Sequence, residues 1–505
     1  MKLTAFTKPI DTVLSILLFI SVVGSAWSQE TDKPIKTEQV IMLEKYGVQG
    51  IEMKNRMPTP ESSKKLFDAM DYYGAVQTYI WSLPAMGLNG WENANIDMGA
   101  SPDLDGQICF YTGYEGAGGI LTPNTAVTYV ISFVNTETQG PAVWIIPPGK
   151  TAGYVGDYWQ RPVLDVGVGG KEKGKGIKLL IVGPDQEVPK HDGSYTVVRC
   201  PTHVVWLGTR NMEPFGPAHD KVLEGYDSYP YEKPELAGRK KLRKERDPFM
   251  QYQPHGMVFW ENLNTVIQRE KMQERDQFFY AILKNLGIEK GKEFKPSEER
   301  KALLIEAERV GYLMSINNTF KKRFEDARYY EGKRWFTTLV QRPDQIVETH
   351  GQLFERASYF HEAIGSTWAM KMTGPGPGSA YLSQYESPEG GGFDGGKHYE
   401  LVVPADVPAD QFWALTVYDS HSRTMIRNEN KKAEINSLDE LSKNPDGSCT
   451  LYIGPSAPVG MEKNWVQTSE GQTWFTYFRF YGPRMPFFDK SWQLNDIELI
   501  APPKK

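Results

Sequence analysis

The chain has 505 residues, of which 40% are hydrophobic and 12% aromatic, so it is too apolar for a disordered protein. Its formal net charge of −6 is small for this length and excludes the broad basic field with which proteins bind nucleic acid. The three cysteines, Cys109, Cys200 and Cys449, are far apart, and no CxxC or HExxH spacing occurs. We interpret them as small core residues and expect neither a metal site nor another cofactor.

The N-terminal residues have the pattern of a secretory signal peptide. Two lysines precede an apolar run of eleven residues, Val13–Val23, and Ala26 and Ser28 have the spacing that a signal peptidase accepts. The run is shorter than the roughly 20 residues that a membrane-spanning helix needs. Because polar residues follow at once, cleavage before Gln29 is favoured over an N-terminal anchor helix. We therefore expect a periplasmic or secreted protein without stable membrane insertion.

The next part of the chain predicts one helix and then a β-rich module. The segment 62–84 has helical spacing and is expected to end at Pro84. Its predicted apolar side consists of Leu66, Met70, Tyr73 and Gln77. Between Tyr129 and Val205, short apolar runs are broken by glycine and proline, which is typical of a β-sandwich or barrel.

A charged stretch and a helical segment follow. Residues 231–255 concentrate charge of both signs without apolar periodicity, which favours a solvated linker over a basic patch. In the segment after it, Phe279, Leu283 and Leu286 share one helical face, with Gly287 suited to the position after the helix. Ser297 is the expected N-cap of another helix. The predicted stripe of that helix is Leu303, Ala307, Val310 and Met314.

From about Tyr381 the chain returns to short apolar strands, and no repeat of fixed period is present. The predicted fold class is therefore mainly β with α, in which two β-sandwich-like modules are separated by a helical segment. The predicted boundaries are 1–28 for the signal peptide, 29–230 for the N-terminal β-rich module and its preceding helix, 231–255 for the charged linker, 256–335 for the helical segment and 336–505 for the C-terminal β-sandwich module.

The segment FWALTVYDSH, residues 412–421, predicts an interior strand with a polar end. Alternation places Trp413, Leu415, Val417, Asp419 and His421 on one face, and both faces are apolar through Val417. Asp419 and His421 are two residues apart where the strand ends. A carboxylate beside a histidine can fix its tautomer and raise its basicity, so the pair is a candidate for activating water.

The segment WFTYFRFYGP, residues 474–483, places an arginine among aromatic side chains. Phe475, Tyr477, Arg479 and Tyr481 lie on one face of the predicted strand. A buried guanidinium must stack on rings or pair with a carboxylate, for which Asp419 and Glu400 are candidates. If it faced a cavity instead, it could hold a substrate carboxylate, phosphate or sulfate. The alternative is a structural ion pair of Arg479 with Asp419 at the rim of the sandwich.

The glycine-rich segment GGKEKGK, residues 169–175, comes close to a P-loop but lacks its last element. Gly176 stands where a P-loop needs Ser or Thr, and the next residues predict a strand rather than a helix. Nucleotide hydrolysis by this route is excluded. The segment is either a solvated hairpin or a hairpin whose lysines weakly attract an anionic ligand.

Several motifs occur in an order that resembles a known pair of bacterial domains. These are LTPNTAVTY, GPAVWIIPPG, FWALTVYD, DGSCTLYIGP and FRFYGP. They resemble the domains of unknown function twelve-fifty-four (N-terminal) and twelve-fourteen (C-terminal). The resemblance implies two β-sandwich-like modules with helices between them, in proteins that are often exported and for which hydrolase activity has been suggested. An aspartate usual in the first motif is replaced near Ala126 or Val127, so chemistry that depends on it would be altered here.

Two function hypotheses follow from these patterns. The first is an exported hydrolase acting on small anionic or glycan-derived molecules in a pocket between the modules. Asp419 and His421 would be catalytic, and the substrate-binding residues would be Arg479, Tyr418, Tyr481 and Trp413. The alternative is a non-catalytic glycan- or anion-binding protein that uses the same aromatic and arginine contacts. The expected partners are a small-molecule or glycan ligand and further copies of the chain in a homo-oligomer, with no nucleic acid.

Overall fold

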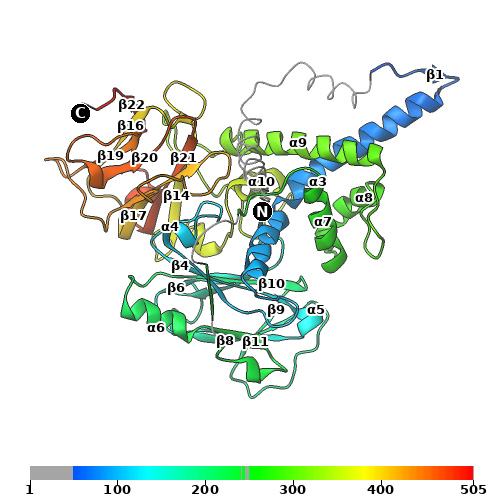
Figure 1. The fold of residues 1–505 in the computed structure, drawn as a ribbon, viewed down its shortest axis with the longest axis horizontal. Coiled ribbons are helices and arrows are strands. Elements are labelled where there is room, and N and C mark those ends of the chain that lie inside the picture. The colour runs from blue at the N-terminus through cyan, green and yellow to red at the C-terminus, as the bar shows by residue number, and fades with distance from the viewer. Residues whose placement is uncertain (1–48, 240, 245–249, 504–505) are drawn as a thin grey trace, which may run out of the picture. The chain divides into compact units, whose positions relative to one another are not determined.

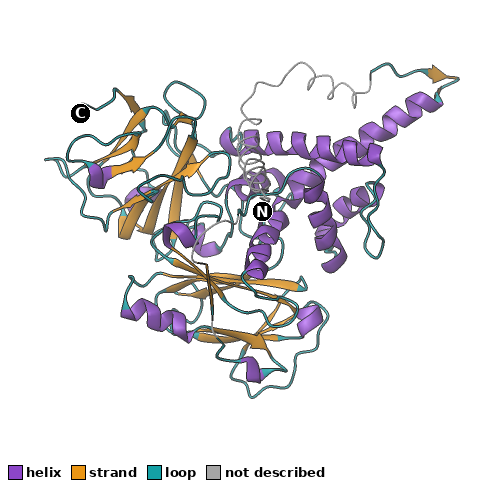
Figure 2. Cartoon of the chain, in the orientation of Figure 1, coloured by secondary structure: helices purple, strands orange, loops and turns teal. Residues whose placement is uncertain are grey.

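The computed structural model describes residues 49–239, 241–244 and 250–503, so the predicted signal peptide lies outside the described residues. The chain divides into two compact units, Met1–Tyr73 and Gly74–Lys505. The first holds β1 (Met53–Lys54), β2 (Met57–Pro58) and the start of helix α3 (Pro60–Asp97). Figures 1 and 2 show the order and type of the elements. None of the helices in the described part is long and apolar enough to cross a membrane.

Helix α3 is longer than its sequence predicts. Pro84 lies inside it, because neighbouring parts of the chain bind the backbone near the proline. Gln160 donates a hydrogen bond to the Pro84 carbonyl (2.7 Å), and Arg356 donates one to the Trp81 carbonyl (2.7 Å). The predicted apolar side is also wrong in part. Met70 and Tyr73 are exposed.

The N-terminal β region contains two sheets. A six-stranded sheet has the order β12-β3-β4-β10-β6-β7, and a four-stranded sheet has the order β11-β5-β8-β9. The strands are β3 (Cys109–Thr112), β4 (Thr128–Asn135), β5 (Ala142–Ile146), β6 (Thr151–Gly156), β7 (Pro162–Gly167), β8 (Ile177–Val182), β9 (Thr196–Arg199), β10 (Val204–Asn211), β11 (Asp227–Pro230) and β12 (Leu242–Lys244). The short helices are α4 (Gly113–Gly116), α5 (Thr136–Gln139) and α6 (Pro217–Gly225). Strand β12 comes from the charged stretch and pairs in parallel with β3.

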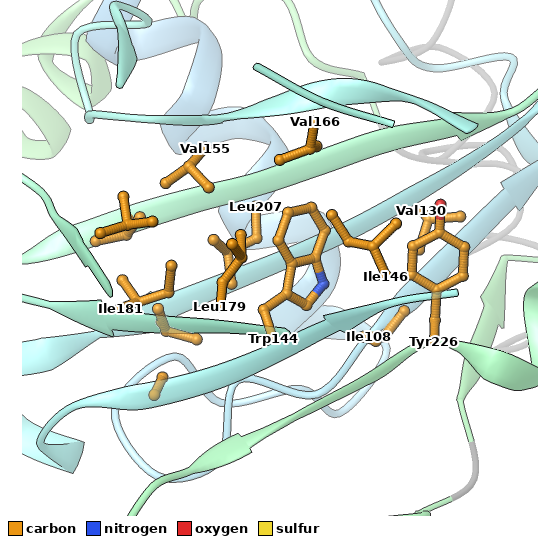
Figure 3. Packing of buried hydrophobic residues seen from close by; sticks show 14 of the residues in the cluster. Ile108, Val130, Trp144, Ile146, Val155, Val166, Leu179, Ile181, Leu207 and Tyr226 are labelled. Atoms are coloured by element: carbon orange, nitrogen blue, oxygen red, sulfur yellow. The ribbon is translucent and has the colours of Figure 1, made fainter. Parts of the chain in front are cut away.

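The two sheets enclose one apolar core. Val130, Val155 and Leu207 of the six-stranded sheet pack toward Trp144 and Leu179 of the four-stranded sheet, as Figure 3 shows. All five side chains are fully buried. Because side chains alternate along a strand, the neighbours of the first three residues must lie on the opposite face of the six-stranded sheet.

The helical segment agrees with its prediction in most details. It contains α7 (Met257–Arg269), α8 (Gln277–Asn285) and α9 (Glu298–Phe320), whereas a further helix, α10 (Leu353–Glu362), lies in the range predicted for the C-terminal module. The Ser297 side chain accepts a hydrogen bond from the Arg300 amide and so caps α9, and Gly287 follows α8 with a φ of 90°. The predicted stripe of α9 is buried except for Met314.

The C-terminal β region again contains two sheets. The larger has the order β13-β14-β21-β17-β18, with β15 also paired to β21, and the smaller has the order β20-β19-β16-β22. The elements are β13 (Phe336–Thr337), β14 (Ser379–Gln384), β15 (Phe393–Asp394), β16 (His398–Val403), β17 (Ala409–Asp419), β18 (Glu434–Asn436), β19 (Cys449–Gly454), β20 (Trp465–Gln467), β21 (Thr473–Pro483), β22 (Glu498–Ile500) and helix α11 (Met485–Phe488). Two β regions separated by helices confirm the predicted fold class. The three cysteines are free and buried, as predicted.

Candidate functional site

The outer face of the six-stranded N-terminal sheet carries polar and aromatic side chains. Arg210 on β10 pairs across the sheet with Tyr129 on β4 and with Ala152 on β6. Two residues further along β6, Tyr154 pairs with Asp165 on β7. Since residues in register share a face, all of these side chains point away from the apolar core.

This face forms one wall of a cavity of about 300 Å³. The opposite walls come from the segment 364–378, which includes the 3₁₀ turn Trp368–Met370, and from β14, β17 and β21 of the C-terminal region. Many lining groups are aromatic rings or thioethers, and these belong to Trp91, Tyr129, Tyr154, Trp206, Trp368, Tyr381, Tyr481, Met212, Met370 and Met372. Charged or amide groups come from Asp165, Lys173, Arg210 and Gln411. An apolar cavity with a few converging polar groups is the usual form of a small-molecule site.

Arg210 is the only guanidinium among the residues that line this cavity. It donates a hydrogen bond to the Met370 sulfur at 3.4 Å. Burial acts to lower the pKa of Arg210, but interactions with nearby tyrosine hydroxyls, that of Tyr381 foremost, act in the opposite direction and are stronger. The net result is a pKa above the ordinary value of an arginine. Tyr381 contributes a buried hydroxyl without a well-formed hydrogen bond of its own. No ion pair joins Arg210 to a carboxylate in the described parts of the chain.

Other polar atoms on the same walls also lack partners among the described residues. The Asp165 Oδ1 and Trp206 Nε1 atoms are buried without a hydrogen bond. Desolvation raises the pKa of the Asp165 carboxyl to about 6. Gly208, between Trp206 and Arg210, makes room for the cavity wall, because a side chain there would meet the Trp206 ring at 2.2 Å. The Trp206 ring therefore lies flat over the strand.

Arg479 lies in a second, smaller cavity of about 40 Å³. It donates hydrogen bonds to Thr416 Oγ1 (2.6 Å) and to the Thr122 carbonyl (2.8 Å). Thr416 in turn donates to the Glu434 carboxylate (2.8 Å). The rings of Tyr381, Tyr418 and Tyr477 surround the guanidinium at 5.4 to 6.0 Å from their centroids. Rings and protein oxygens thus satisfy this cation.

Three predicted substrate-binding residues contact the N-terminal region instead of an open site. Arg479 binds the Thr122 carbonyl, and Tyr418 donates to the Pro123 carbonyl at 2.6 Å. Asn124 donates to the Tyr481 hydroxyl at 2.8 Å. These contacts bind the TPN motif, residues 122–124, to the C-terminal sheet, and of the three predicted residues Tyr481 also lines the larger cavity.

The structure does not bring Asp419 together with Arg479. Arg479 pairs with Ala414 across β17 and β21, whereas Asp419 pairs with Trp474 five positions away. Because five is an odd number of positions, Asp419 and Arg479 lie on opposite faces of the sheet. Glu400, the other candidate partner, lies on β16 of the smaller sheet. The carboxylate nearest in the Arg479 network is that of Glu434.

Asp419 is the last residue of β17, and it forms a turn with His421 and Ser422. Asp419 Oδ1 accepts hydrogen bonds from the backbone amides of His421 (3.1 Å) and Ser422 (2.7 Å) and from the Ser422 hydroxyl (2.9 Å). The His421 ring lies 6.2 Å from that of Tyr252. Neither residue lines either of the two cavities. Trp413 stacks on Phe478 in the C-terminal core, with ring centroids 5.3 Å apart.

Sequence reasoning missed Arg210 and Asp165, although alternation places Trp206, Gly208 and Arg210 on one face of a strand. Of the lysines in the segment GGKEKGK, Lys173 lines the larger cavity, while Lys175 lines a separate surface groove.

The expected absence of a metal site is not tested by a structure without ions. No cluster of three or more metal-ligating side chains occurs in the part of the chain that the structure describes.

Comparison with known proteins gives a family and a fold. None of the curated proteins matches the chain. The crystal structure of the VPA0106 protein from Vibrio parahaemolyticus is similar over 85% of this chain and 100% of its own, with 15% identity and a TM-score of 0.52. The match to an uncharacterized protein from Burkholderia cenocepacia covers 92% of this chain and 95% of that one, with 10% identity and a TM-score of 0.38.

At this level of identity the Vibrio structure supports the fold alone. The family comparison is more specific, because each β region matches its own family of proteins of unknown function. Residues 111–219 match DUF1254, and residues 378–485 match DUF1214. The chain therefore combines an N-terminal region that matches DUF1254 with a C-terminal region that matches DUF1214.

Proposed function

We propose that this protein binds a small organic anion with an apolar body in the larger cavity. Arg210 is the observation that carries the proposal. Its guanidinium lines the cavity, and its hydrogen-bonding partners are a thioether sulfur, which is a weak acceptor, and the neutral hydroxyl of Tyr381, with no carboxylate among them. A partly buried cation without an anionic acceptor is unfavourable, and a carboxylate, sulfonate or phosphate would accept hydrogen bonds from its remaining N–H groups.

The walls indicate the rest of the ligand. The rings of Tyr154 and Trp206 lie edge to face with centroids 4.5 Å apart, and methionines lie opposite them. Such walls favour an aliphatic or aromatic body over a highly hydrated one. The volume of about 300 Å³ is at the lower end of the roughly 300–1,000 Å³ that small-molecule sites occupy. Both features support a compact amphipathic anion.

Hydrolysis stays a separate hypothesis. It requires a base at the bound ligand, and Asp419 and His421 do not line the cavity. Of the two hypotheses drawn from the sequence, the geometry therefore supports binding better. Export, glycan preference and homo-oligomer formation stay predictions from the sequence.

The test is isothermal titration of the purified protein with small aliphatic and aromatic carboxylates and sulfonates and with their uncharged amides. We expect anions to bind more tightly than the matched amides. Arg210→Met should weaken anion binding roughly 10- to 100-fold, the value of a charge-assisted hydrogen bond. Arg323→Met, at an exposed position away from the cavity, is the matched control. Equal binding of acids and amides, or unchanged binding by Arg210→Met, would contradict the proposal.

A further inference from the structure

The cavity has a second charged group on the same sheet face as Arg210. Asp165 and Arg210 are two strands apart, with β6 between them, and two residues apart along the strand direction. With strand spacings of about 4.8 Å and a rise of about 3.4 Å per residue, their Cα atoms are about 12 Å apart. Both side chains therefore border one cavity at separated places on its wall.

Asp165 has no cation to neutralise it. Its Oδ1 atom lacks a hydrogen bond, and the structure shows no ion pair between Asp165 and a Lys, Arg or His of the described ranges. Its carboxyl is stabilised as an anion by the Ala369 amide alone, while burial disfavours the charged form. Lys173 also borders the cavity, but it is exposed and not ion-paired with Asp165.

We infer that the ligand is amphoteric: it carries a protonated amine that binds Asp165 as well as the anionic group that binds Arg210. This inference rests on the proposed function, because it concerns a second group of the same ligand. Two unneutralised charges of opposite sign on one apolar wall match such a ligand, whose body would lie along the rings between them. A plain organic anion would leave the partly buried Asp165 carboxylate without a cation and its Oδ1 atom without a hydrogen bond, which is unfavourable.

The inference assigns Asp165 a part in specificity. The Asp165 carboxylate distinguishes an amine from a methyl group, because it forms a charge-assisted hydrogen bond only with the amine. An apolar wall alone would instead favour the methyl compound, because transfer of an amine out of water is unfavourable. The sign of this preference therefore distinguishes a site that uses Asp165 from one that does not.

The experiment is isothermal titration of the full chain with two matched pairs in which the body separates the two groups: 5-aminopentanoate against pentanoate, and para-(aminomethyl)benzoate against para-methylbenzoate. We expect at least one amine-bearing member to bind about tenfold or more tightly than its partner, the lower range for a hydrogen bond between charged groups. Asp165→Asn should remove that preference and leave the affinity for the plain carboxylate nearly unchanged. Asp410→Asn, at a largely exposed carboxylate on the surface, is the control and should keep the preference.

The outcomes separate the two proposals. Plain carboxylates that bind through Arg210 without any preference for the amine would overturn this inference and leave the proposed function standing. A preference that survives in a folded Asp165→Asn variant would also overturn it. Failure of every member of both pairs to bind would overturn both. Circular dichroism of each variant shows whether it is folded, and Asp165→Leu provides a second variant that removes the charge.

Discussion

Arg479 is buried and Arg210 is partly buried, both close to the contact of the same two β regions, and they differ in their partners. Arg479 has oxygen acceptors at 2.6 and 2.8 Å and three tyrosine rings around it. Arg210 has a sulfur acceptor at 3.4 Å and borders the larger cavity. The difference teaches that burial of a cation does not identify a binding site. N–H donors that lack a strong acceptor do.

The first prediction concerns Arg479, whose loss should have the largest effect. Arg479→Met leaves the buried Glu434 without its nearby cation and removes the hydrogen bond to the Thr122 carbonyl. We expect the free energy of unfolding to fall by about 3–5 kcal/mol, as when one partner of a buried charge network is removed. Urea denaturation followed by tryptophan fluorescence measures it. A loss as small as that of Arg323→Met would show that Arg479 is not a structural cation.

Arg210 should behave in the opposite way. We expect Arg210→Met to weaken anion binding roughly 10- to 100-fold while the urea midpoint of the free protein stays the same or rises. The midpoint should not fall, because the substitution removes a partly buried charge that lacks a carboxylate partner and leaves no opposite charge unpaired. Ligand-induced protection against urea, compared between wild type and variant, measures both effects in one experiment. A large loss of stability in the absence of ligand would show that Arg210, like Arg479, is a structural cation.

Asp165 gives a prediction that depends on pH. Burial raises its pKa in the folded protein to about 6, from an ordinary value of 3.8. The folded chain therefore holds this proton more tightly than the unfolded chain, and the ionised carboxylate destabilises the fold above pH 6. This destabilisation decreases below pH 6 and is absent below the unfolded-state pKa. After allowance for solvent screening, Asp165→Asn should stabilise the protein by about 1–2 kcal/mol near neutral pH.

The measurement is the thermal midpoint of wild type and Asp165→Asn in buffers from about pH 4 to pH 8. The two midpoints should be close at pH 4 and should separate as the pH rises through 6. Asp410→Asn, which removes a carboxylate that is 70% exposed, should show no such separation. A separation that is largest in acid would have the wrong sign and would contradict the raised pKa.

Much of the C-terminal region could be predicted because alternation fixes which residues share a strand face. The predicted face with Tyr477, Arg479 and Tyr481 exists, and so does the predicted face with Trp413 and Asp419. Alternation along single strands does not say which face of β17 lies beside which face of β21. That depends on the register, Ala414 with Arg479, which is set between segments about 60 residues apart.

The cavity could not be predicted from the sequence for a related reason. Its walls combine β6, β7 and β10 with the segment 364–378 and with Tyr481, parts of the chain that no local pattern connects. Arg210 could be assigned to a strand face but not to a cavity, because neither the missing carboxylate nor the Met370 contact is visible in the sequence. The polar end of FWALTVYDSH was apparent, but its hydrogen bonds within the turn were not.

Asp419 yields the smallest expected effect and tests the hydrolase hypothesis. Asn keeps an oxygen that can accept from the His421 and Ser422 amides, so Asp419→Asn should change the free energy of unfolding by about 1 kcal/mol or less. A catalytic base would behave differently, because its loss lowers turnover roughly 10²- to 10⁴-fold. Product release from ester, amide, phosphate and glycoside substrates, compared among wild type, Asp419→Asn and His421→Ala, separates the two roles. We expect any turnover to be unchanged in the folded variants, because neither side chain lines the cavity that holds Arg210. A loss of at least a hundredfold would instead place a catalytic site at the end of β17 and separate it from the anion-binding cavity.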